Sequence, residues 1–87
     1  MNLPSIKNSA FAPSNNSLED VLIELERYGE PMLLKMKKGW LSKVEVFVTG
    51  KGTSFDVRSD YRRTPHDAAS ECYDRLMLAI KLIKESK

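Results

Sequence analysis

The chain has 87 residues, and its composition of 41% hydrophobic and 30% charged residues is typical of one small globular domain. A single cysteine, Cys72, excludes an internal disulfide, and one cysteine with one histidine cannot form a closed zinc site. No apolar run reaches the roughly 18 residues that cross a membrane, and the first residues lack the pattern of a secretory signal. We therefore expect a cytoplasmic protein without membrane contact, metal, cofactor or small-molecule substrate.

Residues 1–16 are rich in asparagine, serine and proline, which favour turns over regular structure. The segment is predicted to be an N-terminal arm, and residues 17–87 are predicted to be the folded domain. Two alternatives remain for the arm. Either it is a flexible tail, or its apolar residues Leu3, Ile6 and Phe11 dock onto an exposed apolar surface.

A first helix is predicted to begin after Ser17, a good N-cap residue, with Asp20 three positions later as in a capping box. Apolar residues then recur at helical spacing, at Leu18, Val21, Leu22, Leu25 and Tyr28. Gly29 is expected to end the helix in the left-handed conformation, and Pro31 blocks its continuation.

Three extended runs follow, over residues 32–37, 40–49 and 53–61, separated by turn residues at Lys38-Gly39 and Gly50-Lys51-Gly52. Short connections between successive strands favour an antiparallel meander. Alternation along the strands predicts one strongly apolar face, formed by Met32, Leu34, Met36, Val44, Val46, Val48, Phe55 and Val57.

The last helix is predicted from Thr64, its N-cap, with Pro65 in the first helical position. Its apolar stripe is Ala69, Cys72, Tyr73, Leu76, Ile80 and Ile83. Both helices carry one apolar stripe, and the sheet carries one apolar face. We therefore predict an α+β domain in the order α-β-β-β-α, a three-stranded antiparallel meander with two helices packed on one face.

The opposite sheet face is predicted to be open, and it includes outward-pointing apolar residues. The residues assigned to a protein interface there are Leu33, Leu41, Phe47, Lys43 and Arg58. Three interpretations compete: Phe47 stacks on a base of a single-stranded nucleic acid, the face pairs with a second copy in a homodimer, or the arm covers it. Because the acids Glu45 and Asp56 share this face, a protein contact with the arm or a partner is favoured.

Charge is distributed unevenly along the chain. Acidic residues predominate in residues 18–30, whereas basic residues predominate in residues 35–63. The basic residues predicted to contact nucleic acid are Lys37, Lys38, Lys51, Arg62 and Arg63. The alternative is that these are ordinary solvated charges.

Catalysis is not expected. His66 is predicted to face solvent in the first turn of the last helix, whereas Cys72 falls on that helix's buried stripe, so the two cannot form a dyad. The sequence therefore predicts a protein that is not an enzyme.

The order α-β-β-β-α resembles that of the double-stranded-RNA-binding domain over about residues 17–83. Leu22 and Leu25 on the first helix, the run from Val44 to Val48 followed by glycines, and the pair Ala68-Ala69 are similar to features of that family. The resemblance implies phosphate contacts from the first hairpin turn and the start of the last helix. The family's Gly-Pro-x-His loop is replaced here by Lys37-Lys38-Gly39-Trp40, and the first helix is acidic. The chain also resembles small phage-encoded accessory proteins, which would place it in a host cytoplasm.

These observations lead to two functional expectations. The first is a non-enzymatic domain, similar to the double-stranded-RNA-binding domain, that binds nucleic acid through phosphate contacts. The alternative is a protein-binding accessory or inhibitor domain that acts through the acidic first helix or the open sheet face.

Overall fold

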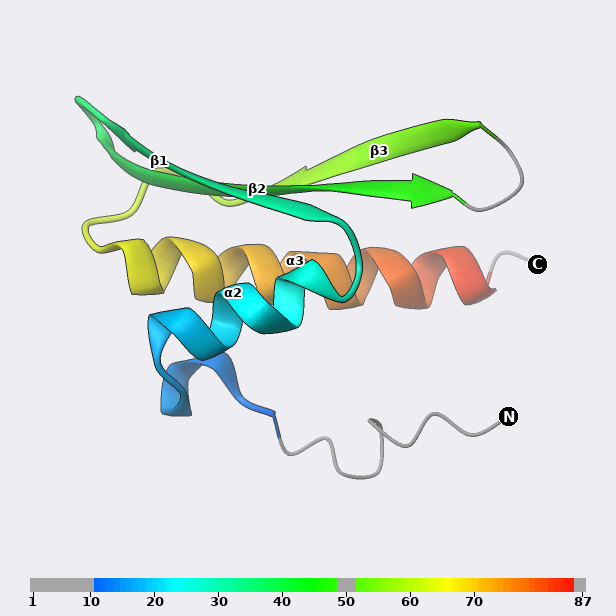
Figure 1. The fold of residues 1–87 in the computed structure, drawn as a ribbon, viewed down its shortest axis with the longest axis horizontal. Helices are drawn as coiled ribbons and strands as arrows, with labels where there is room; N and C mark the ends of the chain where they lie inside the picture. Colours follow the sequence, from blue (N-terminus) through cyan, green and yellow to red (C-terminus); the bar gives the residue numbers. More distant parts are fainter. Residues whose placement is uncertain (1–10, 49–51, 86–87) are drawn as a thin grey trace.

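The computed structural model describes residues 11–48 and 52–85, and it shows a three-stranded antiparallel sheet with helices on one side (Figure 1). The elements are η1 (Pro13–Asn15), α2 (Leu18–Glu26), β1 (Glu30–Met36), β2 (Gly39–Val48), β3 (Thr53–Arg58) and α3 (Pro65–Glu85). The strand order is β1-β2-β3, so the predicted meander and the α-β-β-β-α order are confirmed. Thr49, Gly50 and Lys51 lie outside the described residues.

Both helices start where the sequence predicts. The Ser17 hydroxyl accepts a hydrogen bond from the Asp20 N–H at 3.1 Å, and the Thr64 hydroxyl accepts one from the Asp67 N–H at 3.0 Å. These bonds satisfy N–H groups that have no partner within the helix. Within the described parts of the chain, no helix is long and apolar enough to cross a membrane.

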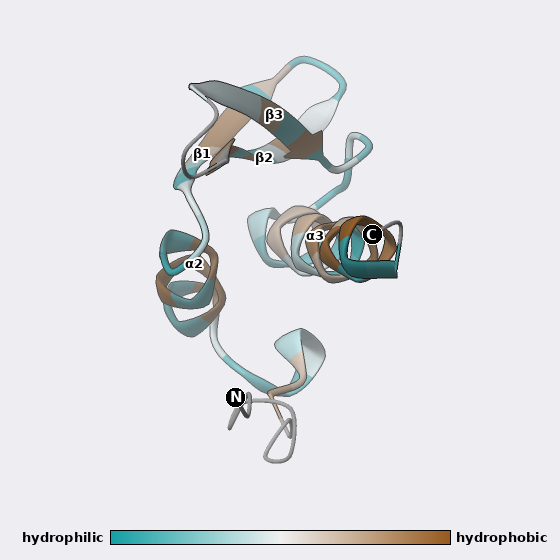
Figure 2. Ribbon diagram, turned by 90° about the vertical axis from the view of Figure 1, so that its right-hand side faces the viewer, coloured by the Kyte–Doolittle hydropathy of each residue, from teal (hydrophilic) through white to brown (hydrophobic). Residues whose placement is uncertain are grey.

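The core lies between the sheet and the two helices (Figure 2). Its buried side chains come from both layers: Val21 and Leu25 from α2, Val44 and Val57 from the sheet, and Ala69, Cys72 and Leu76 from α3. Phe11 packs against this core as well, with its ring centroid 5.1 Å from that of Tyr73. The part of the arm that the structure describes thus lies on the helical side, and Leu3 and Ile6 lie outside the described residues.

The predicted orientation of β1 is wrong. Leu33 pairs with the buried Ser42 and therefore points toward the helices, whereas Met32, Leu34 and Met36 point away from them and are 48%, 38% and 42% exposed. The pairing explains the difference. Met36 pairs with Gly39, so a two-residue turn at Lys37 and Lys38 aligns the odd-numbered residues of β1 with the even-numbered residues of β2.

Gly29 also differs from expectation, because its φ is not positive. A glycine is needed there for a different reason. A Cβ atom at this position would collide with the backbone carbonyl of Glu45 on β2. Gly29 thus allows the chain leaving α2 to pass close to the centre of the sheet.

Candidate functional site

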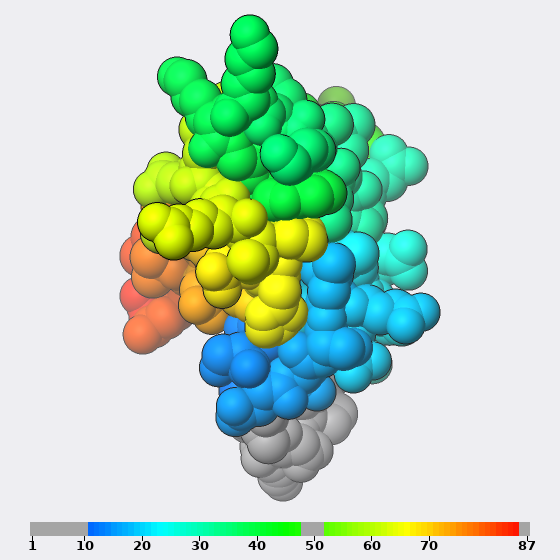
Figure 3. Space-filling model, turned by 90° about the vertical axis from the view of Figure 1, so that its left-hand side faces the viewer, coloured from blue at the N-terminus to red at the C-terminus, as the bar shows by residue number. Residues whose placement is uncertain are grey.

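Two basic segments that are far apart in the sequence meet at one end of the molecule. The backbones of Trp40 and Arg62 form a pair of hydrogen bonds, of 2.7 Å from the Trp40 N–H and 2.9 Å from the Arg62 N–H. This pairing joins the start of β2 to the segment before α3. Figure 3 shows the tip of the β1–β2 hairpin next to the start of α3. We call Lys37, Lys38, Arg62 and Arg63, all exposed, the basic end.

Aromatic rings support lysines near the basic end. The Lys38 Nζ lies 5.6 Å from the centroid of the Tyr61 ring, and the Lys35 Nζ lies 5.8 Å from that of Trp40. Both distances allow a cation–π attraction, which holds a lysine without neutralising it. The Lys38 charge is thereby held beside the segment that carries Arg62 and Arg63.

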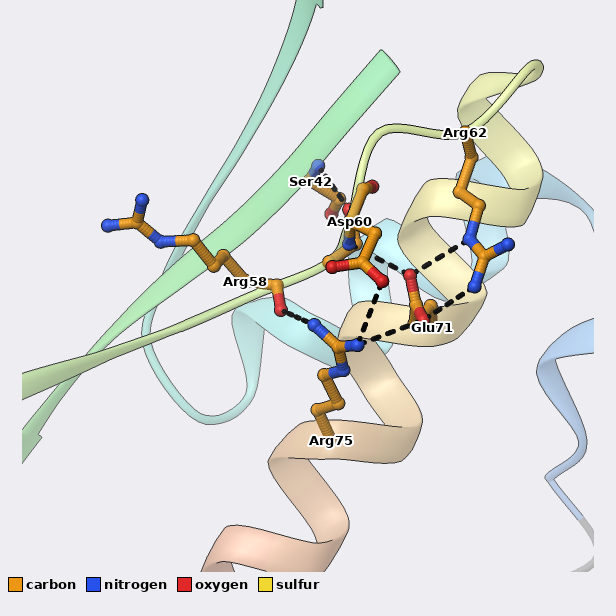
Figure 4. A network of polar contacts seen from close by, with 7 residues as sticks. Ser42, Arg58, Asp60, Arg62, Glu71 and Arg75 are labelled. Atoms are coloured by element: carbon orange, nitrogen blue, oxygen red, sulfur yellow. Dashed lines mark hydrogen bonds and ion pairs between the residues drawn. The ribbon is translucent and has the colours of Figure 1, made fainter. Parts of the chain in front are cut away.

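Arg62 is engaged in a network of polar contacts (Figure 4). Its Nε and Nη2 atoms donate to the two carboxylate oxygens of Glu71, at 3.0 and 2.7 Å. Arg75 reaches the same carboxylate from one helical turn further on, at 3.2 Å, and also contacts Asp60 at 3.3 Å. The Asp60 N–H donates to Glu71 as well. The network fastens the segment before α3 to the helix itself, so Arg62 has a structural role.

The network strongly favours the charged form of Glu71. The pKa of the Glu71 carboxyl is lowered to about 2, mainly by the hydrogen bonds from Arg62. Burial of the carboxyl acts in the opposite direction, whereas the Asp60 N–H and the charge of Arg75 lower the pKa further. The hydrogen bond to Glu71 likewise raises the pKa of Arg62.

Glu71→Gln is expected to lower the free energy of unfolding by about 1 to 2 kcal/mol at pH 7, a figure reduced for the solvent exposure of both arginines. The pKa of Glu71 is depressed from 4.5 to about 2, so the carboxylate stabilises the fold above about pH 4.5. That stabilisation is lost as the pH falls toward 2. Urea denaturation at several pH values should therefore show the two proteins converging in acid. Asp74→Asn, at an exposed position of α3, is the control, and a difference from wild type that does not change with pH would contradict this account.

The structure thus brings together four of the five residues predicted to contact nucleic acid. Lys51 lies outside the described residues. Sequence reasoning did not find the partners Glu71 and Arg75, although their spacing of four residues on one helix is a recognisable signal. It also did not find the aromatic supports Trp40 and Tyr61.

Four of the five residues predicted for a protein interface lie on the sheet face that points away from the helices. Leu41, Lys43 and Phe47 come from β2 and Arg58 from β3, whereas Leu33 lies on the opposite face. We call this surface the open face. Its remaining members, by the strand pairing, are Glu30, Met32, Leu34, Met36, Glu45, Ser54 and Asp56.

His66 does not simply face solvent. It is half-buried, and its Nε2 lies 2.9 Å from the Pro13 carbonyl oxygen and 2.7 Å from that of Asn16, so it ties the start of α3 to η1. Cys72 is fully buried, as predicted, and this burial raises the pKa of its thiol. Among the residues that the structure describes, no group of three or more His, Cys, Asp or Glu is placed to hold a metal ion.

A shallow hollow of about 680 Å³ lies where α2 leads into β1. Its lining includes three carboxylates, Glu26, Glu30 and Glu45, and one base, Lys43. This composition repels phosphate. Four of its lining residues, Glu30, Met32, Lys43 and Glu45, belong to the open face, so the basic end and the open face are the two candidate surfaces. Comparison with protein-family models, with curated proteins and with solved structures gives no match to this chain.

Proposed function

We propose that this protein is a non-enzymatic domain that binds nucleic acid through phosphate contacts of its basic end. The observation that carries the proposal is the pairing of Trp40 with Arg62, which sets the hairpin tip that carries Lys37 and Lys38 beside the segment that carries Arg63. Positive side chains that converge on one exposed end attract a phosphate backbone and release its counterions. Because Arg62 is held by Glu71, we assign the phosphate contacts to Lys37, Lys38 and Arg63.

An electrophoretic shift assay with duplex RNA, duplex DNA and single-stranded probes across a salt series tests this proposal. Three phosphate contacts predict that the affinity falls by about 40-fold for a duplex, and by about 20-fold for a single strand, between 50 and 200 mM salt. Lys37→Gln/Lys38→Gln is expected to weaken binding at least tenfold. Lys81→Gln/Lys84→Gln removes the same charge from exposed positions late in α3 and should change little.

Absence of binding to every probe at 20 mM salt would overturn the proposal. Equal losses for the two double variants would also count against it, because binding would then depend on net charge and not on the basic end. Circular dichroism of each variant establishes that the fold is retained.

A second candidate, a protein-binding accessory or inhibitor domain, is favoured by a different observation. The open face carries Phe47 at 57% exposure, together with Met32, Leu34 and Met36. Exposed apolar side chains that lie together commonly mark an interaction surface. The exposed Ile23 on the acidic helix α2 is a further apolar residue without a core position.

A further inference from the structure

The open face combines apolar side chains with an unusual arrangement of charge. The strand pairing sets Glu30 beside Glu45 and Glu45 beside Asp56, which makes an acidic row across all three strands. The adjacent row pairs Lys43 with Arg58. Like charges directly opposite each other on neighbouring strands destabilise a sheet.

Contacts within the sheet relieve this repulsion only in part. The Lys43 Nζ lies 4.0 Å from the Asp56 carboxylate, and the Ser54 hydroxyl donates to Glu45 at 3.0 Å. The Arg58 side chain points away from the network that its own carbonyl joins (Figure 4). The two rows would both be compensated by a surface that presents the opposite charges at the same spacing.

A second copy of the open face presents that surface to the strands β2 and β3. Along β2 the order of outward side chains is Leu41, Lys43, Glu45, Phe47, which is apolar, basic, acidic, apolar. The proposed two-fold axis lies between the two stacked sheets, runs perpendicular to the strands and passes over Val44. Rotation about this axis reverses the order of side chains along β2 in the second copy. Lys43 then faces the second copy's Glu45, and Leu41 faces its Phe47. The same rotation brings Arg58 opposite the second copy's Asp56 and Glu30 opposite its Met32. Two of the three acids in the row therefore gain an opposite charge.

We propose that the open face forms a symmetric homodimer, in which the two sheets stack and their β2 strands run antiparallel to each other. The charge pattern selects this arrangement, because a two-fold axis parallel to the strands would place Lys43 on Lys43 and Glu45 on Glu45. Self-complementarity of this kind is what a two-fold interface requires. The inference does not depend on nucleic-acid binding.

The face is small for a protein interface. A ten-residue strand is about 33 Å long, and three strands with their side chains are about 15 Å wide. Because β1 and β3 have only seven and six residues, stacking would bury roughly 400 Å² on each copy, a size typical of weak, transient interfaces. We therefore expect a weak dimer whose population depends on protein concentration.

Analytical ultracentrifugation over a concentration series tests the dimer and its geometry. Lys43→Glu and Glu45→Lys should each weaken self-association at least tenfold. In either variant residues 43 and 45 have the same charge, and the two-fold axis brings them together at two places in the dimer. An equimolar mixture of the two variants should associate again, since every reversed charge then meets its opposite. The double variant Lys43→Glu/Glu45→Lys should self-associate about as well as wild type. Lys81→Glu, on α3, is the control that leaves association unchanged.

A wild-type protein that stays monomeric up to about 1 mM would overturn the proposal and leave the open face to a different protein. Single variants that associate as wild type would place the dimer contact elsewhere, for example at the exposed Leu78 and Leu82 of α3. Single variants that are monomeric and stay so when mixed would refute the proposed two-fold axis. Circular dichroism of every variant separates loss of association from loss of the fold.

Discussion

Leu76→Ala is expected to lower the free energy of unfolding by about 2 to 5 kcal/mol. Leu76 is fully buried and lies on α3, in the cluster where both helices meet the sheet. Its truncation removes apolar contacts and leaves a cavity that the neighbouring side chains fill only partly. A domain of this size has a total stability near the low end of 5 to 15 kcal/mol, so the loss is a large share of it. Urea denaturation followed by circular dichroism measures the change.

Leu82→Ala is the matched control, because Leu82 is on the same helix and is 56% exposed. The same chemical change there should alter the stability by no more than about 0.5 kcal/mol. Similar losses for the two variants would contradict the packing of α3 described above. A loss at Leu82 alone would mean that the helix presents its other side to the sheet.

The elements were predictable because their signals are local. Ser17 and Thr64 begin helices through hydrogen bonds to residues three positions away, and the apolar spacing of α2 places Val21 and Leu25 on one side. Such interactions depend on a few consecutive residues. The order of elements and the side of each helix that is buried follow from them.

The orientation of β1 could also have been predicted from the sequence, but the prediction from hydrophobicity alone was wrong. Met32, Leu34 and Met36 are more apolar than the alternating set that contains Leu33 and Lys35, yet they lie outside. A two-residue hairpin turn pairs residues of opposite parity, whether the turn lies at 37–38 or at 38–39. Since Val44 points inward, Leu33 must do so as well. Turn geometry therefore outweighs hydrophobicity in this edge strand.

The role of Arg62 could not be predicted, because it depends on the distance between two segments in space. Nothing near Arg62 in the sequence distinguishes it from Arg63. The position of Glu71 on α3 gives the two arginines different roles, because Glu71 accepts two hydrogen bonds from Arg62. A similar argument applies to His66, whose partners lie at Pro13 and Asn16.

The two proposed surfaces do not share residues, and this makes them separable by experiment. Lys43 and Arg58 belong to the open face, whereas Lys37 and Lys38 belong to the basic end. In the proposed dimer the two-fold axis directs the two basic ends away from each other. Lys43→Glu should therefore weaken self-association at least tenfold, while a single copy keeps most of its affinity for a short nucleic-acid probe.

Gly39→Ala is expected to lower the free energy of unfolding by about 2 to 4 kcal/mol and to weaken nucleic-acid binding as well. Gly39 has a φ of 136°, a conformation that residues with a side chain rarely adopt. A Cβ atom there would also lie 2.5 Å from the carbonyl oxygen of Arg62, the group that accepts the Trp40 hydrogen bond. The substitution should push the hairpin tip away from the segment before α3 and so separate Lys37 and Lys38 from Arg63.

Gly52→Ala separates backbone strain from this collision. Gly52 has a φ of 63°, but a Cβ atom there would meet nothing within 4 Å. Its substitution should cost only about 1 to 2 kcal/mol, the cost of the left-handed conformation, and should leave nucleic-acid affinity unchanged. Denaturation and the shift assay, applied to both variants, measure the two effects. A Gly39→Ala variant that is less stable but keeps full affinity for nucleic acid would contradict the proposed interface. The close approach of the two basic segments would then have no part in binding.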